Sequence, residues 1–356
     1  MLSIFDNGGP PACPVPFNLA AYVLQHAEAR AEHPAILISG NKDDQVWSYA
    51  AFSAAVRGTA TGLLNYGFNT GDILLMRMGN TIDFPIIFLA AISVGIIPVP
   101  TSAQLTSREV ERIARDLNPA GVVSAPGIST VSHDRQLSLP DLQKMRDCPA
   151  ADFVQSDPNQ LAYIVYTSGT GGTPRAVGHA HRAIWARRMM IRDWYDLRPQ
   201  DRLLHAGAFN WTFTLGTGIM DPLSVGATAV IPAADTDLAG LPEILARTEA
   251  SIFAAVPGVY RKILKSETLP KLPALRHGLA AGEKLSTDIR TQWQTRVGTA
   301  IYEAFGMSEC STFISSAPHR PAEPKNLGTP QVGRRIAILG EDGPAPIGTE
   351  GIIAIH

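Results

Sequence analysis

A short run rich in hydroxyls and glycines, with one cation, could bind phosphate groups in this 356-residue chain. The run spans residues 166–177 and follows the apolar segment 161–165. Its candidate binding residues are Thr167, Ser168, Gly169, Thr170, Gly171, Gly172 and Arg175. Glycines let the backbone approach a ligand closely, successive backbone N–H groups can form a concave anion site, and a guanidinium suits phosphate oxygens. The run predicts a loop that grips a polyphosphate, and its composition leaves an ordinary surface loop open as the alternative.

Two further motifs follow strand-like apolar segments, at residues 281–286 and 302–309. Their candidate site residues are Gly282, Glu283, Lys284, Tyr302, Glu303, Ala304, Phe305, Gly306, Met307, Ser308 and Glu309. Parallel sheets place ligand sites at the carboxyl ends of their strands. We therefore expect these two motifs and the run 166–177 to form one shared site. The spacings of P-loop enzymes and of dinucleotide-binding folds are not satisfied by this sequence.

The run 166–177 resembles the phosphate loop of the AMP-forming adenylating superfamily, which includes acyl-CoA synthetases, aryl-CoA ligases, luciferases and peptide-synthetase adenylation domains. The superfamily pattern there is roughly Tyr-Thr-Ser-Gly-Thr-Thr-Gly-x-Pro-Lys-Gly-Val. This chain departs from it with Gly171 for Thr, Arg175 for Lys and Ala176 for Gly. Arginine keeps the charge of the lysine, but its planar fork is not equivalent to an ammonium.

The other motifs fit the same resemblance, in the order that the superfamily has. Residues 281–286 resemble the Gly-Glu loop beside the adenine and the acyl carboxylate. Residues 302–309 resemble the Tyr-Gly-x-Thr-Glu motif, with Phe305 for Tyr and Ser308 for Thr. Residues 328–333 resemble the Gly-x-Pro-x-x-Gly element that follows it. The resemblance therefore covers nearly the whole chain.

The resemblance implies a two-step reaction. A carboxylate attacks the α-phosphate of MgATP to give acyl-AMP and pyrophosphate, and a thiol, commonly coenzyme A, then displaces AMP. It implies catalytic roles for Arg175, Ser308 and Glu309, stacking of Phe305 on adenine, and Mg²⁺ binding by Glu309. The remaining residues of the three motifs would bind the nucleotide. ATP, Mg²⁺ and coenzyme A are the implied cofactors and co-substrates.

The acid is expected to bind near residues 209–216, with Gly282 and Met307. The candidate pocket residues are Phe209, Asn210, Trp211 and Phe213, because aromatics with small neighbours suit a mostly apolar slot. Peptide-synthetase domains usually have an Asp where this chain has Asn210, which disfavours an amino acid. The segment holds no Arg or Lys for a second carboxylate. We expect an aryl acid of benzoate type or a short- to medium-chain fatty acid.

Two other functions stay open. The chain could be a catalytically weak adenylate-binding or regulatory protein, or an activating domain that loads a carrier protein. In the superfamily the chain continues with a ribose-binding Asp, a hinge and a mobile C-terminal domain. This sequence stops at His356, before those parts. We therefore expect only the large N-terminal domain, which would adenylate slowly.

The sequence predicts that helices and strands alternate along the chain and position these motifs. This alternation is typical of parallel sheets with helices on their faces. We predict two related α/β subdomains, residues 1–160 and 161–325, and the start of a smaller antiparallel β subdomain at 326–356. Predicted helices include residues 19–31, with Asn18 as the cap, 107–116 and 179–195, and predicted strands include residues 121–124 and 202–205. Four arginines on the helix 179–195, Arg182, Arg187, Arg188 and Arg192, are expected to lie on a solvated face, with an acceptor site as the alternative.

Composition narrows the class of protein. A net charge of −2 with scattered charges argues against nucleic-acid partners. The longest apolar run, residues 84–100, is shorter than the roughly 20 residues a bilayer span needs and is predicted to be a buried helix and strand, without stable membrane insertion. Three scattered cysteines and an N-terminus without a basic region fit a cytoplasmic protein. His179 and His181 are expected to be structural. Whether the chain is a monomer or a homodimer stays open.

Overall fold

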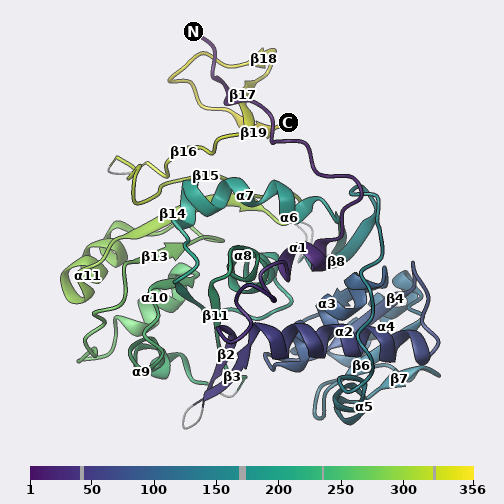
Figure 1. Ribbon diagram of the computed structural model, residues 1–356. Helices are drawn as coiled ribbons and strands as arrows, with labels where there is room; N and C mark the ends of the chain where they lie inside the picture. Colours follow the sequence, from purple (N-terminus) through teal and green to yellow (C-terminus); the bar gives the residue numbers. More distant parts are fainter. Residues whose placement is uncertain (41–43, 168–173, 235, 324–325) are drawn as a thin grey trace.

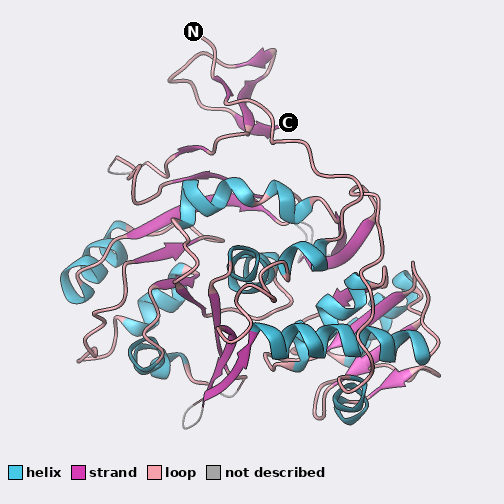
Figure 2. Ribbon diagram, viewed as in Figure 1, coloured by secondary structure: helices cyan, strands magenta, loops and turns pink. Residues whose placement is uncertain are grey.

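Two α/β units lie side by side in the computed structural model, and a small β-sheet lies beyond them (Figure 1). The structure describes residues 1–40, 44–167, 174–234, 236–323 and 326–356. Figure 2 shows helices packed along the strands of both units. The predicted fold class is confirmed: helix-flanked, mainly parallel sheets with a smaller antiparallel sheet near the C-terminus.

The larger unit is built on a nine-stranded sheet with the order β16-β15-β14-β13-β12-β10-β11-β2-β3. Its parallel strands are β14 (Ile301–Met307), β13 (His277–Ala280), β12 (Ile252–Ala255), β10 (Arg202–His205), β11 (Thr228–Pro232) and β2 (Pro34–Ser39). Antiparallel strands lie at the edges: β3 (Asp44–Ser48), β15 (Ser311–Ser315) and β16 (Thr329–Pro330). Strands β11, β12 and β13 are buried along their whole length, as parallel strands covered on both faces should be.

The helices of this unit follow its strands along the chain. They are α8 (Asp221–Val225), α9 (Leu241–Arg247), α10 (Pro257–Ile263) and α11 (Thr287–Val297). Helix α10 begins at a proline, and the hydroxyl of Ser286 caps α11 by accepting from the Ile289 N–H at 3.3 Å. Tyr260 and Trp293 pack edge to face with ring centroids 4.8 Å apart, which joins these two helices.

The smaller unit has a four-stranded parallel sheet with the order β5-β4-β6-β7. Its strands are β5 (Ile97–Pro100), β4 (Ile73–Arg77), β6 (Gly121–Ser124) and β7 (Gln136–Leu137), and its helices are α2 (Tyr49–Asn65), α3 (Asp83–Ser93), α4 (Ser107–Leu117) and α5 (Leu139–Met145). Every residue of α3 is buried, so the apolar run 84–100 is a core helix and a strand, as predicted. Among the described residues, no helix has the length and apolarity that crossing a bilayer requires.

The run 166–177 does not lie after a strand of either parallel sheet. Strands β8 (Leu161–Thr167) and β9 (Arg175–Ala180) form an antiparallel hairpin around it, with Val165 opposite Val177. The helix predicted at residues 179–195 is therefore wrong at its start, because His179 belongs to β9. Residues 179 and 180 pair with β8, and the backbone hydrogen bonds of this pairing outweigh the preference of the segment for a helix. The helical part is short and broken, with α6 (Ala183–Ala186), α7 (Arg188–Met190) and a π-helical segment, Ile191–Tyr195.

The small sheet is antiparallel and contains both ends of the chain (Figure 1). It consists of β1 (Ile4–Asp6), β17 (Arg335–Gly340), β18 (Gly343–Pro344) and β19 (Ile352–Ile355). The C-terminal strands were predicted, but the pairing of Phe5 with Ile336 was not. Strands β2 and β3 likewise join the sheet of the later strands, so sheet membership crosses the predicted boundary at residue 160. The division into subdomains stays a prediction.

The first helix, α1 (Leu19–Val23), is shorter than the predicted 19–31. After it the chain continues in turns, and the side chain of Gln25 donates to the carbonyl of Ser224 at 2.8 Å. Asn18 caps α1 as expected. His181 holds the start of the helix, since the Leu19 N–H donates to its Nδ1 at 3.0 Å. This structural role agrees with the sequence-based expectation for His181.

Because of His181, the protein should lose stability as the pH falls. Burial lowers the pKa of His181 from 6.5 to about 4, so between these values the unfolded chain binds a proton that the folded chain does not. The free energy of unfolding then falls with pH by up to about 1.4 kcal/mol per pH unit for this one group. The Oδ1 of Asn in His181→Asn can accept the same bond but does not titrate. Urea unfolding at several pH values should therefore show that the free energy of unfolding of this variant depends less steeply on pH. The same pH dependence in the variant and the original protein would show that His181 does not cause this loss of stability.

Candidate active site

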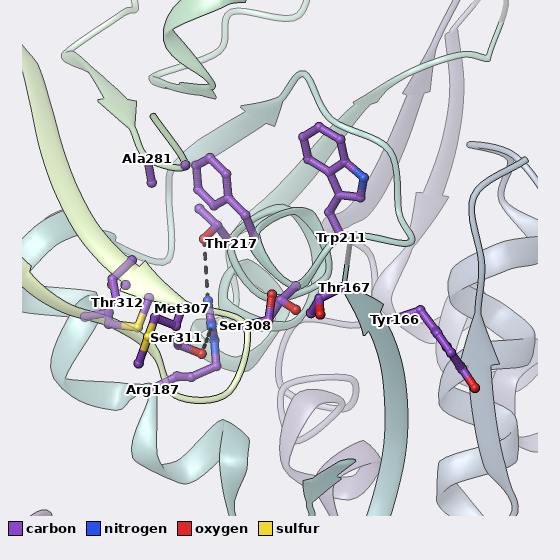
Figure 3. A pocket seen from close by; sticks show the side chains of 15 residues that line it. Tyr166, Thr167, Arg187, Trp211, Thr217, Ala281, Met307, Ser308, Ser311 and Thr312 are labelled. Atoms are coloured by element: carbon purple, nitrogen blue, oxygen red, sulfur yellow. Dashed lines mark hydrogen bonds between the residues drawn. The ribbon is translucent and has the colours of Figure 1, made fainter. Parts of the chain in front are cut away.

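A cleft of about 360 Å³ lies where the hairpin β8–β9, the end of β13 and the turn between β14 and β15 meet (Figure 3). Its walls are Tyr166, Thr167, Arg187, Met190, Trp211, Thr212, Phe213, Thr217, Ala281, Gly282, Gly306, Met307, Ser308, Ser311 and Thr312. All three sequence motifs and the aromatic segment contribute to it. The volume is within the range of small-molecule sites. The structure thus brings together what the sequence predicted as one shared site.

A second cavity of about 960 Å³ adjoins the cleft and shares Gly282 and Gly306 with it. Residues of the second and third motifs line it, and Asn326 and Leu327 complete the wall. Phe305 is 38% exposed here and packs edge to face on Phe313, with ring centroids 5.5 Å apart. Aromatic faces can stack on any nucleobase. A flat ligand in this cavity could stack on Phe305 while a second group enters the cleft.

Gly306 lines both cavities and lies close to a neighbouring strand. A Cβ on this residue would collide with the backbone of Ser311, which crosses close to it on the neighbouring strand β15. Gly282, at the end of β13, has a positive φ of 89°, a conformation that glycine adopts without strain. Both glycines therefore allow the backbone to follow a path around the site that a residue with a side chain would not allow without strain or a collision.

Glu303 connects the motif at residues 281–286 with the motif at residues 302–309. Its buried carboxylate accepts a bond from the Leu285 N–H at 2.8 Å and another from Arg290 at 3.1 Å. The first of these bonds holds the loop 281–286 against β14. Because its oxygens have these protein partners, Glu303 supports the site rather than offering a free carboxylate to it.

A buried ion pair lies at one wall of the cleft. Arg187 donates to Asp221, with an Nε–Oδ1 distance of 3.0 Å, and both side chains are almost inaccessible to solvent. Burial alone would lower the pKa of Arg187, but the Asp221 carboxylate outweighs it and raises this pKa. Tyr195 donates to Asp221 at 2.8 Å and bonds to Thr217, and burial raises the pKa of Tyr195 well above its usual value. Arg187 therefore stays charged.

The sequence pattern of the AMP-binding enzyme family matches residues 23–356. The chain belongs to this family. The decisive point is that the match runs through the three motifs that the fold assembles around the cleft.

Curated relatives of this AMP-binding enzyme include a benzoate–CoA ligase of Thauera aromatica, 28% identical over 87% of this chain and 63% of the relative. An uncharacterized acyl–CoA ligase of Bacillus subtilis is 23% identical over 96% of this chain and 68% of the relative. The chain spans 54% of a hydroxybenzoate–CoA ligase of Thauera aromatica, at 27% identity.

Solved structures show the same fold. An anthranilate CoA ligase in complex with anthranoyl-AMP superposes with a TM-score of 0.88 at 21% identity, covering 97% of this chain and 69% of the other. A benzoate CoA ligase of Burkholderia xenovorans superposes with a TM-score of 0.84 at 23% identity, covering 95% and 71%.

Three predicted site residues of this AMP-binding enzyme lie elsewhere. Phe209 is buried against Phe84, with ring centroids 4.8 Å apart, and its N–H donates to Asn80 of the smaller unit. It joins the two α/β units and does not line the cleft, and neither does the neighbouring Asn210. The Tyr302 ring packs edge to face on His277 and lines neither cavity. The structure therefore does not place these three residues on the walls of either cavity: Tyr302 lies on a strand whose alternate residues point to opposite faces, and Phe209 packs between the two units.

The other predicted residues are placed as follows. Thr167, Trp211, Phe213, Gly282, Gly306, Met307 and Ser308 line the cleft, and Gly282, Glu283, Lys284, Glu303, Ala304, Phe305 and Gly306 line the second cavity. Arg175 is exposed on β9 opposite Thr167, and Glu309 is exposed beside Ser308. Ser168, Gly169, Thr170, Gly171 and Gly172 lie outside the described residues.

The cleft residues outside the motifs and the aromatic segment, which sequence reasoning missed, are Arg187, Met190, Thr217, Ser311 and Thr312. Arg187 was expected on a solvated face but is 4% exposed, so that prediction is wrong. The broken helix turns its side chain inward to Asp221, a partner 34 positions away. A lone Asp in an apolar segment, Asp221 between Met220 and Pro222, was the one signal that a buried cation was needed.

Mg²⁺ requires few protein ligands at such a site. Within the described part of the chain, no group of three or more His, Cys, Asp or Glu side chains could hold a metal by itself. Mg²⁺ bound with a nucleotide usually takes one or two carboxylates and the phosphates. The exposed carboxylate of Glu309, next to the cleft residue Ser308, fits that limited need.

Proposed function

We propose that this protein activates a carboxylic acid with MgATP, forming acyl-AMP and pyrophosphate, as the first half of an acid–thiol ligase reaction with coenzyme A. The observation that carries the proposal is a single cleft in which the three motifs meet the aromatic segment around Trp211 and Phe213. Membership of the AMP-binding enzyme family and the likeness to CoA ligases support it.

The chain's own residues would align the reactants. Thr167 and Arg175, which are paired where β8 ends and β9 begins, would bind phosphate oxygens, and Ser308 would donate to the α-phosphate. Phe305 would hold the adenine in the second cavity. Adenylate formation needs in-line alignment and neutralisation of charge rather than a covalent enzyme intermediate. Bound to Glu309, Mg²⁺ would supply that neutralisation at the phosphates.

The acid would occupy the cleft beside Trp211 and Phe213. We propose an aryl acid of benzoate type or a short- to medium-chain fatty acid. The cleft volume of about 360 Å³ and the aromatic wall support this, and so do the benzoate–CoA and hydroxybenzoate–CoA ligases among the relatives. We further propose a cytoplasmic location, supported by three cysteines, Cys13, Cys148 and Cys310, none of which forms a disulfide.

Acyl sulfamoyl adenosines, which mimic acyl-AMP but cannot react, test this proposal by thermal shift. At a hundred times its Kd, a bound analogue should stabilise the fold by roughly 2.7 kcal/mol and raise the melting temperature. Benzoyl and alkyl analogues compared side by side would separate the two acid classes, with adenosine alone as the control. No shift with any analogue, AMP or ATP would contradict the proposed function.

A further inference from the structure

The ion pair at the wall of the cleft ends in a hydroxyl that faces the cavity. Arg187 Nη1 donates to Ser311 Oγ at 2.6 Å, and Figure 3 shows Arg187 between Thr217 and Ser311. Both Arg187 and Ser311 line the cleft. The arginine therefore connects a buried carboxylate behind the wall with a hydroxyl at the surface of the wall.

The donor and the acceptor of each hydrogen bond in this network can be assigned. Tyr195 donates to Asp221, so the bond between Tyr195 and Thr217 must use the Thr217 hydrogen. Arg187 donates to Asp221 and to Ser311, so Ser311 Oγ accepts and keeps its own hydrogen. Within the described residues, no acceptor is found for that hydrogen. The network thus presents an O–H donor to the cleft, polarised by a guanidinium that bonds to its oxygen.

Ser311 adopts a backbone conformation that is uncommon for its residue type. Its φ is +60°, in the left-handed region, at the first residue of β15. Such conformations are strained in a residue other than glycine and cluster at ligand sites. A glycine would be the unstrained choice here, but it would lack the hydroxyl. The strained serine supports a role for that hydroxyl.

The charge of the network indicates which kind of group it can receive. Arg187 and Asp221 compensate each other, so this ion pair carries no net charge. A second carboxylate on the ligand would enter a half-buried site that already holds the Asp221 anion, at the cost of losing its water. An uncharged oxygen can accept from the Ser311 hydroxyl without that cost.

We propose that Arg187 and Ser311 form a specificity site that selects acids carrying an uncharged hydrogen-bond acceptor, such as a ring hydroxyl or a carbonyl oxygen. This inference rests on the proposed function, because it names the acid that the cleft prefers. Ser311 touches the ligand, and Arg187 is a positioning residue that acts through it. Acids with an entirely apolar body and dicarboxylic acids bind less well.

Isothermal titration of the purified chain tests the proposal with acyl sulfamoyl adenosines. The acyl groups are benzoyl, the three hydroxybenzoyl isomers and a carboxybenzoyl. At least one hydroxybenzoyl isomer should bind about tenfold or more tightly than benzoyl, as a hydrogen bond to a charge-assisted donor would give. In Ser311→Ala the hydroxybenzoyl analogue should bind no more tightly than the benzoyl analogue. Ser132→Ala, at an exposed serine that is not among the cleft walls, is the matched control.

Each outcome decides the proposal. Ser311→Gly, which suits a positive φ, replaces Ser311→Ala if that variant does not fold. Equal binding of benzoyl and hydroxybenzoyl analogues, or a preference that survives the loss of Ser311, overturns the inference and leaves the proposed function standing. Tightest binding of the carboxybenzoyl analogue overturns it as well. If no analogue binds, the proposed function is wrong and the inference fails with it.

Discussion

Replacing Glu309 by Gln is expected to slow adenylate formation by about 100-fold, with little effect on stability. The amide keeps the shape of the side chain but removes the charge that Mg²⁺ requires. The side chain is exposed beside the cleft, so its loss should leave the core intact. Exchange of radiolabelled pyrophosphate into ATP, in the presence of the acid, measures the step directly.

The matched control for this prediction is Glu350→Gln. Glu350 is also exposed, but it lies in the turn before β19, in the small antiparallel sheet. This variant should exchange pyrophosphate at the rate of the original protein. Equal rates for Glu309→Gln and Glu350→Gln would exclude Glu309 as the metal ligand.

Asp221→Asn should lower the free energy of unfolding by about 3–5 kcal/mol, because it leaves the buried Arg187 guanidinium without its counter-charge. Arg187 also bonds to Ser311 at the cleft wall. Urea unfolding, monitored by tryptophan fluorescence, gives the change from the midpoint and the slope. The same change should weaken binding of any ligand in the cleft.

An exposed ion pair provides the control for the buried one. Arg57 and Asp152 are 3.4 Å apart, with Asp152 fully exposed, so Asp152→Asn should cost less than about 1 kcal/mol. Replacing both buried partners, in Arg187→Met with Asp221→Leu, should recover part of the loss, since no unpaired charge remains. If Asp221→Asn is as mild as Asp152→Asn, the pair does not stabilise the fold as described.

Local sequence patterns were enough to predict much of the parallel sheets. The strands at residues 202–205 and 121–124 were predicted with the bounds that the structure shows, because a short apolar run between polar turns has few other stable states. The helix after Ser107 was also predicted, and it has a capping box between Thr106 and Glu109. Elements stabilised by distant partners were missed, among them β1, which pairs with β17, and β3, which pairs with β2.

At the candidate site, too, local patterns predicted some features, and others depend on residues that are distant in the sequence. The order and residue types of three motifs predicted that one shared site exists, and their resemblance to the adenylating superfamily implied that it suits a nucleotide and an acid. Only the tertiary structure decided which neighbours complete the cleft. Arg187 finds Asp221 across 34 positions and Ser311 across 124, and no local pattern marks either pair. A buried charge is tolerated only where folding provides a partner, and that partner depends on how the broken helix after β9 packs against the turn between β14 and β15.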